Sequence, residues 1–208
     1  MSAKPASPRR RGRPEKFNDR RLEVLQTAAR TFSELGFRQA TLEDIAGALG
    51  ITRPALYHYA DSKDALLAEC SEIARQALAK AVDRARIEPN GLAQIESFFS
   101  SYCAIVCDDF GRCMMITSLS EMEETQRKST HDAQLALAQD VTDMIRCGIE
   151  DGSIRQCDAV LASRCLFATF NGVARWWTDR DRAKPVALAA SLLDLFFTGL
   201  IPRDGAVA

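Results

Sequence analysis

The spacing of apolar residues along this chain is helical from Asn18 onward. Apolar positions return every three or four residues, and no stretch alternates with the period of two that a strand would show. Segments rich in Gly, Pro, Asn and Asp interrupt the pattern, which contains no internal repeat. The pattern predicts an all-α fold with helices at about 19–35, 42–49, 53–59, 63–86, 91–109, 112–123, 127–150, 158–180 and 185–199.

Two short predicted helices near the N-terminus carry clear end signals. Thr41, with Asp44 three residues later, predicts a capping box, and Gly50 suits the position just after the first short helix. Thr52 can cap the second short helix, with Pro54 in its first turn. Two short helices around a glycine-containing turn form a helix-turn-helix pattern. Helices this short are only marginally stable by themselves in water, so the preceding predicted helix must pack against both of them.

Composition divides the chain into three parts. The 208 residues are 47% hydrophobic and 26% charged, which is ordinary for a globular protein. Residues 1–63 carry 12 Lys and Arg against 7 Asp and Glu, whereas residues 64–208 carry 15 against 21. This balance favours a polyanion-binding head, although a basic tail alone would also produce it. The predicted parts are a disordered basic arm at 1–17, a helix-turn-helix domain at 18–65 that would bind DNA, and a larger helical body at 66–208.

The stretch "FSELGFRQATLEDIAGALGITRPALYHYADSKDALL" carries the most specific motif of the chain. Its features are Gly36-Phe37, Thr41, Ile45-Ala46, Leu49-Gly50-Ile51, Leu56-Tyr57, Ser62-Lys63 and Leu66-Leu67. Over about residues 20–67 the chain resembles the DNA-binding head of the TetR family of transcriptional regulators. It departs from the usual pattern at Tyr59 and Ala60, where a histidine and a phenylalanine are common. The resemblance implies a homodimeric repressor that releases its operator when a small molecule binds the body.

Three consecutive side chains of the second short helix, Tyr57, His58 and Tyr59, fan over about 200°. Leu56 before them fills the core, so at least two of the three must face outward, where phenol and imidazole groups can reach phosphates and thymine methyls. Arg53 begins the same helix and can bind guanine O6 and N7. The predicted DNA-binding residues are Thr41, Thr52, Arg53, Pro54, Ala55, Tyr57, His58, Tyr59, Lys63, Arg11 and Arg13.

Four of these residues lie outside the second short helix and its cap. Thr41 would present a hydroxyl and a helix N-terminus to a phosphate, and Lys63 would pair with the DNA backbone. In the arm, Arg11 and Arg13 flank Gly12 and can reach a narrow A·T-rich minor groove. The alternative for the arm is a solvated tail that makes no contact with DNA.

The body is predicted to hold a dimer interface and a ligand cavity. The helices near 158–180 and 185–199 are apolar almost all round, which favours burial against a second subunit, although internal core helices would look the same. Aromatic and sulfur-containing side chains favour a cavity for a lipophilic or acyl-chain effector, unless most of them are simply core. The predicted ligand-binding residues are Phe98, Tyr102, Cys103, Val106, Met114, Met115, Phe167, Phe170 and Asn171.

Other chemistries have weaker support in the sequence. Cys103 and Cys107 lie four residues apart with Cys113 nearby, which leaves open a thiol sensor or a soft-metal site, although a fourth metal ligand is lacking. An α-helical enzyme is the remaining alternative, but no phosphate-loop, dinucleotide or nucleophile motif is present, and His58 lacks a catalytic partner. The sequence predicts no cofactor and no metal. The first 21 residues lack a secretory apolar region, so we expect a cytoplasmic protein that enters no membrane.

Overall fold

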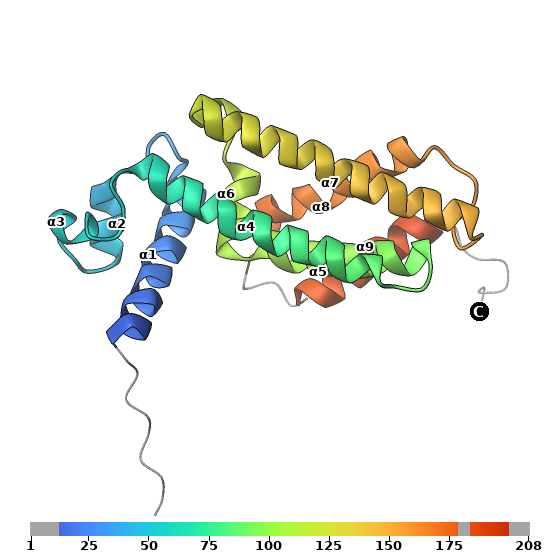
Figure 1. Ribbon diagram of the computed structural model, residues 1–208, viewed down its shortest axis with the longest axis horizontal. Coiled ribbons are helices and arrows are strands. Elements are labelled where there is room, and N and C mark those ends of the chain that lie inside the picture. The colour runs from blue at the N-terminus through green and yellow to red at the C-terminus, as the bar shows by residue number, and fades with distance from the viewer. Residues whose placement is uncertain (1–12, 179–183, 200–208) are drawn as a thin grey trace, which may run out of the picture.

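The computed structural model describes residues 13–178 and 184–199, with side chains from Phe17 onward. The described part consists of helices joined by turns (Figure 1), which confirms the predicted all-α fold. The elements are α1 (Arg13–Leu35), α2 (Leu42–Ala48), α3 (Arg53–Leu56), α4 (Lys63–Arg86), α5 (Gly91–Cys107), α6 (Asp109–Ile116), the short 3-10 helix η1 (Leu119–Glu121), α7 (Glu124–Glu150), α8 (Ala159–Trp176) and α9 (Pro185–Thr198).

Two parts of unequal size share one long helix (Figure 1). The helices α1, α2 and α3 gather with the first turns of α4 into a small head. The helices α5, α7, α8 and α9 form an elongated body, and α6 lies where the two parts meet. Because α4 begins in the head and continues into the body, it crosses the predicted domain boundary between residues 65 and 66.

Several predicted elements have different bounds in the structure, most clearly the first helix and the helix predicted at 112–123. α1 begins at Arg13, so the last five residues of the predicted arm are helical; Pro14 suits a first turn because that position needs no N–H partner. The predicted helix at 112–123 is divided into α6 and η1, because Thr117 between them is extended and Ser118 caps the second element.

The second short helix, α3, is also shorter than predicted. It ends at Leu56, and the following backbone hydrogen bonds run from His58 N–H to Ala55 O at 3.3 Å and from Tyr59 N–H to Leu56 O at 2.9 Å. Bonds with this spacing of three residues tighten the chain into a turn. The aromatic residues at 57–59 therefore lie on a turn that continues the helix, and not on an α-helix.

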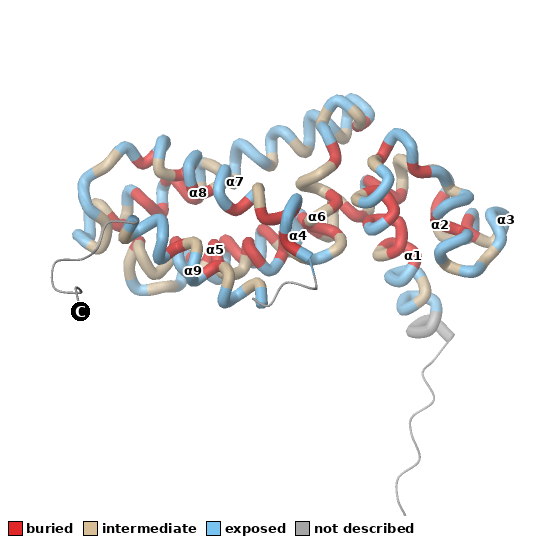
Figure 2. Tube along the Cα trace, turned by 180° about the vertical axis from the view of Figure 1, so that it is seen from behind, coloured by how far each residue is buried: buried red, intermediate tan, exposed pale blue. Residues whose placement is uncertain are grey.

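The head has a core of its own, seen as buried segments in Figure 2. Phe32 of α1 meets Phe37 edge-on, with ring centroids 5.1 Å apart. Ile45 of α2, Leu56 of α3 and Leu66 of α4 are fully covered in the same cluster. Each such side chain contributes about 1.5–3 kcal/mol when it is buried. The two short helices are therefore held by α1 and α4, as their length requires.

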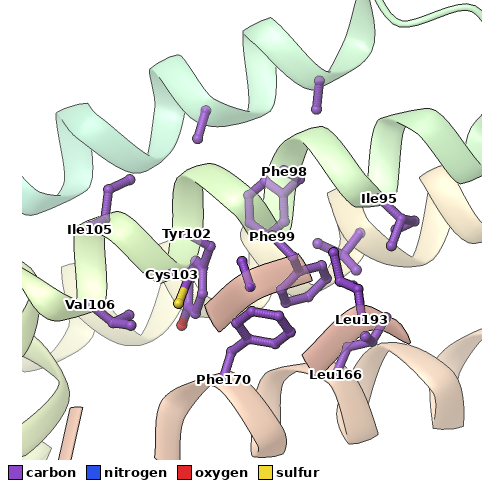
Figure 3. Packing of buried hydrophobic residues seen from close by; sticks show 14 of the residues in the cluster. Ile95, Phe98, Phe99, Tyr102, Cys103, Ile105, Val106, Leu166, Phe170 and Leu193 are labelled. Atoms are coloured by element: carbon purple, nitrogen blue, oxygen red, sulfur yellow. The ribbon is translucent and has the colours of Figure 1, made fainter. Parts of the chain in front are cut away.

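The body core is centred on α5, which packs against α4, α7, α8 and α9. Its aromatic residues Phe98, Phe99 and Tyr102 are buried in one cluster with Phe170 of α8 (Figure 3). The ring centroids of Phe99 and Phe170 lie 4.7 Å apart. This aromatic cluster fixes the position of α8 relative to α5, and with it one wall of the cavity described below.

A close backbone approach locks the far end of the body. A Cβ atom on Gly91 would lie 2.1 Å from the backbone nitrogen of Gly148, so only glycine fits at this crossing of α5 and α7. The Asp151 carboxylate accepts a hydrogen bond from Gly91 N–H at 2.8 Å, and Ser153 Oγ accepts one from Leu92 N–H at 3.1 Å. The turn after α7 thus caps the N-terminus of α5.

Candidate DNA-binding surface and effector cavity

The N-terminus of α2 is fixed by the predicted capping box, which the structure confirms. The Thr41 hydroxyl accepts a hydrogen bond from Asp44 N–H at 3.2 Å and donates to the Asp44 carboxylate at 2.6 Å. The carboxylate also accepts from Thr41 N–H at 2.9 Å. These bonds, the Thr41 hydroxyl first, hold the pKa of Asp44 below its ordinary value. Thr41 is exposed, and its hydroxyl and N–H groups both take part in the cap.

Gly50 makes the turn between α2 and α3. Its φ of 64° lies in the left-handed region that favours glycine, and Ile51 N–H donates to the Ala46 carbonyl at 3.0 Å across the turn. Thr52 occupies the N-cap position of α3, as predicted, but its exposed side chain makes no capping hydrogen bond. Pro54 follows in the first turn and is also exposed. The Thr52 hydroxyl is therefore available to an external acceptor.

Arg53 is held by two side chains on the exposed face of α2 and α3. Its Nη1 forms an ion pair with the Glu43 carboxylate on α2. Its Nε and Nη2 donate to the Tyr57 hydroxyl at 3.1 and 2.9 Å, and the guanidinium carbon lies 5.6 Å from the centre of the Tyr57 ring. The Tyr57 hydroxyl and the Glu43 carboxylate raise the pKa of Arg53, which stays fully charged.

The three consecutive aromatic residues do not share one environment. Tyr57 and His58 are exposed, which confirms that at least two of the three face outward. Tyr59 is half-buried and stacks on Phe17 of α1, with centroids 5.5 Å apart and planes inclined by 17°. Sequence reasoning missed Phe17, because a single aromatic residue inside a non-periodic basic segment gives no signal. Tyr59 thus packs toward α1 and tethers its first turns to the end of α3.

Lys63 lies at the start of α4 and points back into the head. Its ammonium donates to the carbonyl oxygens of Phe37 at 2.7 Å, Ala40 at 3.2 Å and Arg38 at 3.4 Å. The nitrogen also lies 4.5 Å from the centre of the Phe37 ring. An ammonium has three donors, and these carbonyls engage all of them. Lys63 therefore has a structural role in the head, where it binds backbone carbonyls. Its predicted contact with a DNA phosphate stays a prediction.

The other predicted DNA-binding residues are placed less fully. Ala55 is half-buried within α3. Arg13 begins α1, but its side chain is not among those described. Arg11 lies outside the described residues, so its minor-groove contact stays a prediction.

A cavity of about 1510 Å³ lies between α4, α7 and α8. Its lining includes Leu78 and Val82 of α4, Leu137 of α7 and Phe167 of α8. Five of the nine predicted ligand-binding residues line it: Tyr102, Met114, Met115, Phe167 and Asn171. The other four are buried in the body core and do not line the cavity: Phe98, Cys103, Val106 and Phe170. Figure 3 shows Phe98 and Phe170 within this packed cluster, which also contains Phe99 and Tyr102.

Two predicted site residues meet at the cavity wall. The Tyr102 hydroxyl donates to the Asn171 side-chain oxygen at 2.5 Å, and the Met115 sulfur lies 3.6 Å from the same hydroxyl. Burial raises the pKa of Tyr102, so the phenol stays protonated. Because Asn171 uses its oxygen here, its amide N–H₂ group remains as a donor toward a ligand.

One face of α8 presents charge to the cavity. Arg164, Asn171 and Arg175 line it from three turns of the helix, and the two arginines lie about 16 Å apart along it. Within the described residues, neither arginine forms an ion pair. By contrast, Arg86 at the α4 wall pairs with Asp140 at 2.6 Å. The guanidinium groups of α8 are therefore the cations of this wall that a bound anion can use.

Sequence reasoning missed most of the wall formed by α4 and α7. In α7 the lining residues include Ser129, Thr130 and Ala133, which are small or carry hydroxyl groups. Such residues look like an ordinary solvent-exposed helix face, and their spacing has no apolar stripe. The missing signal is the distance between α4 and α7, which no local pattern encodes.

The helix α6 joins the cavity to the head. Phe110 and Cys113 are buried in the head core, whereas Met114 and Met115 of the same helix line the cavity. Asp109 at the start of α6 lies 3.6 Å from Arg30 of α1 in an ion pair. α6 therefore contributes side chains both to the cavity wall and to the head core.

The three cysteines of the thiol or metal alternative are divided between two cores. Cys103 is buried in the body core and Cys113 in the head core, while Cys107 is half-buried at the end of α5. Burial raises the pKa of Cys113 to about 11, which keeps its thiol protonated and unreactive. Among the residues described, no three His, Cys, Asp or Glu side chains are grouped so that they could hold a metal ion.

Two models of known domains match the chain. The model of the bacterial regulatory proteins of the tetR family matches residues 24–70, which contain the helix-turn-helix. The model of the tetracyclin repressor-like C-terminal domain matches residues 88–200, which is more than half of the chain.

The chain belongs to the tetR family. It is therefore a helix-turn-helix transcriptional regulator that binds DNA, and its matched domains are those of a regulator and not of an enzyme. Among the residues that the structure describes, no helix is both long and apolar enough to cross a lipid bilayer.

The chain is also similar to individual transcriptional regulators and to solved structures of the TetR family. The transcriptional repressor KstR2 of Rhodococcus jostii RHA1 is 29% identical over 196 residues, covering 87% of this chain and 91% of its own. The structure of PfmR, a TetR-family regulator of Thermus thermophilus, has 25% identity and a TM-score of 0.77, covering 86% of this chain and 99% of that one. AibR in complex with isovaleryl coenzyme A and operator DNA has 16% identity and a TM-score of 0.74 over 86% of this chain and 98% of its own, a likeness of fold alone.

Proposed function

We propose that the protein is a repressor that leaves its operator when a small amphipathic molecule binds the body cavity. The observation that carries the proposal is that two helices belong to both parts of the molecule. α4 and α6 both line the cavity, and both contribute buried side chains to the head core. The relatives support it, since KstR2 is named a transcriptional repressor and the AibR structure contains both a coenzyme A thioester and operator DNA.

The head is proposed to read DNA with the exposed surface around α3. Thr52, Arg53, Tyr57 and His58 are exposed together there, and a helix-turn-helix places this element in the major groove. Thr41 is exposed at the cap of α2, and its predicted phosphate contact is kept as part of the proposal. The other predicted contacts, from Lys63 and the basic arm, would add affinity for any sequence.

Dimerisation is proposed to use α8 and α9. Large apolar side chains are exposed on both helices, among them Leu161 and Trp176 on α8 and Leu195, Phe196 and Phe197 on α9. An exposed apolar surface of this kind marks a protein interface. Two heads held by one such interface can meet two half-sites of a palindromic operator.

The effector is proposed to be elongated, with an apolar part and an anionic end. Met114, Met115 and Phe167 supply a soft apolar wall, while Asn171 and Arg175 on α8 supply a polar one. A volume of about 1510 Å³ exceeds the roughly 300–1,000 Å³ of common small-molecule sites, which favours a long ligand. An acyl thioester of coenzyme A has this combination of an apolar chain and phosphate groups.

Release is proposed to follow from a population shift. A ligand moves the equilibrium between DNA-binding and released states only as far as it binds the released state better. A ligand that displaces Met115 would move α6, and Phe110 and Cys113 would carry that movement into the head core. Because its partner is chromosomal DNA, we place the protein in the cytoplasm of a bacterium.

The test uses duplexes selected from a random-sequence pool by the purified protein. Operator affinity is then measured by fluorescence anisotropy with octanoyl coenzyme A, octanoate or coenzyme A alone. The proposal expects the thioester to weaken operator binding by at least about fivefold, the lower end of ordinary allosteric coupling. If the thioester binds, as calorimetry would show, and operator affinity stays constant, the proposed coupling is wrong. If none of the three binds, the effector class is wrong.

A further inference from the structure

The ion pair between Glu43 and Arg53 has a consequence for how DNA is read. Both side chains are about half exposed, at 58% and 49% of their surface. An exposed ion pair of this kind contributes little to the stability of a fold. Its effect is instead on the position of the guanidinium, which Glu43 holds from α2 while Tyr57 holds it from the turn after α3.

The donors of Arg53 can be counted. A guanidinium has five N–H donors. The Tyr57 hydroxyl takes one from Nε and one from Nη2, and Glu43 takes one from Nη1. One donor therefore remains on each terminal nitrogen. Two donors on adjacent nitrogens are what guanine O6 and N7 accept in the major groove.

Glu43 also disfavours a contact between Arg53 and a DNA phosphate, which would carry no sequence information. An arginine at the start of a recognition helix can turn to a phosphate, which binds equally well in every sequence. The Glu43 carboxylate repels phosphate oxygens and attracts the guanidinium, so it disfavours that rotamer. Holding a long side chain in one position before binding also reduces the entropy lost on binding.

We propose that Glu43 is a positioning residue for DNA specificity, which holds Arg53 so that it reads a guanine in each half-site instead of a phosphate. This inference rests on the proposed role of Arg53 at the DNA surface. It assigns the specificity of the protein in part to α2, the helix that supports α3.

The test compares four proteins: wild type, Glu43→Gln, Arg53→Ala and the double variant. Each is titrated with a duplex selected by the wild type from a random pool, with every single-base variant of it, and with a scrambled duplex of equal length. Glu34→Gln is the matched control, because Glu34 is an exposed acid of α1 that loses the same charge. Thermal unfolding shows whether each variant keeps its fold.

We expect Glu43→Gln to reduce the ratio of operator to scrambled-duplex affinity by about tenfold, within the range of one good base contact. The loss should fall on one guanine position per half-site, and it should vanish in the Arg53→Ala background. Glu34→Gln should change both affinities by the same factor. Thermal unfolding should stay close to that of the wild type.

Two results would overturn the inference. One is an unchanged affinity ratio in Glu43→Gln when Arg53→Ala does relax one guanine position. The other is a Glu43→Gln effect that persists after Arg53→Ala, which would mean that Glu43 contacts a base itself. If Arg53→Ala changes no base preference, the proposed role of Arg53 fails, and the inference falls with it.

Discussion

The hydroxyl of Tyr102 on α5 lies 2.5 Å from the side-chain oxygen of Asn171 on α8, across 69 positions of sequence. Tyr102 is almost fully covered, whereas Asn171 is exposed toward the cavity. The buried phenol therefore fixes an exposed amide, and it leaves the amide N–H₂ group as the donor that a ligand meets.

Tyr102→Phe should weaken the effector response and leave operator binding intact. The substitution removes the hydroxyl that orients Asn171, and the loss of one hydrogen bond contributes about 0.5–1.5 kcal/mol. The effector concentration needed for half-release should rise by about twofold to tenfold, as measured by anisotropy. Operator affinity without effector is the internal control. A variant that responds like the wild type would show that Asn171 needs no support from Tyr102.

Lys63→Met should lower the thermal stability of the head. The substitution keeps the apolar contact with the Phe37 ring and removes the donors to the carbonyls of Phe37 and Ala40. Carbonyls that lose a charged partner should reduce the free energy of unfolding by about 1–3 kcal/mol. Thermal unfolding and the salt dependence of operator affinity are measured together. A variant of unchanged stability whose salt slope falls by about 1 per half-site would instead show a phosphate contact.

A charge on the exposed apolar face of α8 or α9 should prevent dimerisation without unfolding the protomer. Leu161→Glu and Phe196→Lys are suitable, because both side chains are exposed in the single chain, at 58% and 37%. An unpaired ion buried at an interface costs several kcal/mol. Light scattering should report a monomer with a helical circular dichroism spectrum and weakened operator binding. A stable dimer with both substitutions would place the interface on another face.

The capping box should make the head sensitive to acid. The pKa of Asp44 is lowered in the folded protein, so its contribution to stability is present above the unfolded pKa of about 3.9 and is lost as the pH falls through the lower folded value. Asp44→Ala should therefore be less stable than the wild type at neutral pH, and the gap between the two should narrow below about pH 4. Melting temperatures over this pH range measure the gap. A gap that is constant with pH would exclude the carboxylate as its cause.

The parts of the fold that were predictable are those encoded by local signals. The capping box of Thr41 and Asp44 and the left-handed turn at Gly50 involve residues within a few positions of one another. Helix propensity and capping act over that same range, so the pattern alone located them. Helical geometry, with Leu56 in the core, also predicted that at least two of Tyr57, His58 and Tyr59 face outward.

The parts that were not predictable depend on contacts between distant segments. Nothing near Lys63 in the sequence indicates that its ammonium binds carbonyls more than 20 positions away. Likewise, Phe98 and Tyr102 lie one turn apart on α5, yet Tyr102 lines the cavity and Phe98 does not. Which of two apolar neighbours meets a cavity depends on how α4, α7 and α8 are spaced, and that spacing is a property of the packed body.

The most direct test of the proposed coupling asks whether operator DNA changes the affinity of the cavity for its ligand. The affinity for octanoyl coenzyme A is measured by calorimetry with the free protein and with the protein saturated by its selected operator. Because the two sites are coupled, the operator must weaken thioester binding by the same factor by which the thioester weakens operator binding. We predict equal factors of at least about five. Identical thioester affinities with and without operator would contradict the coupling.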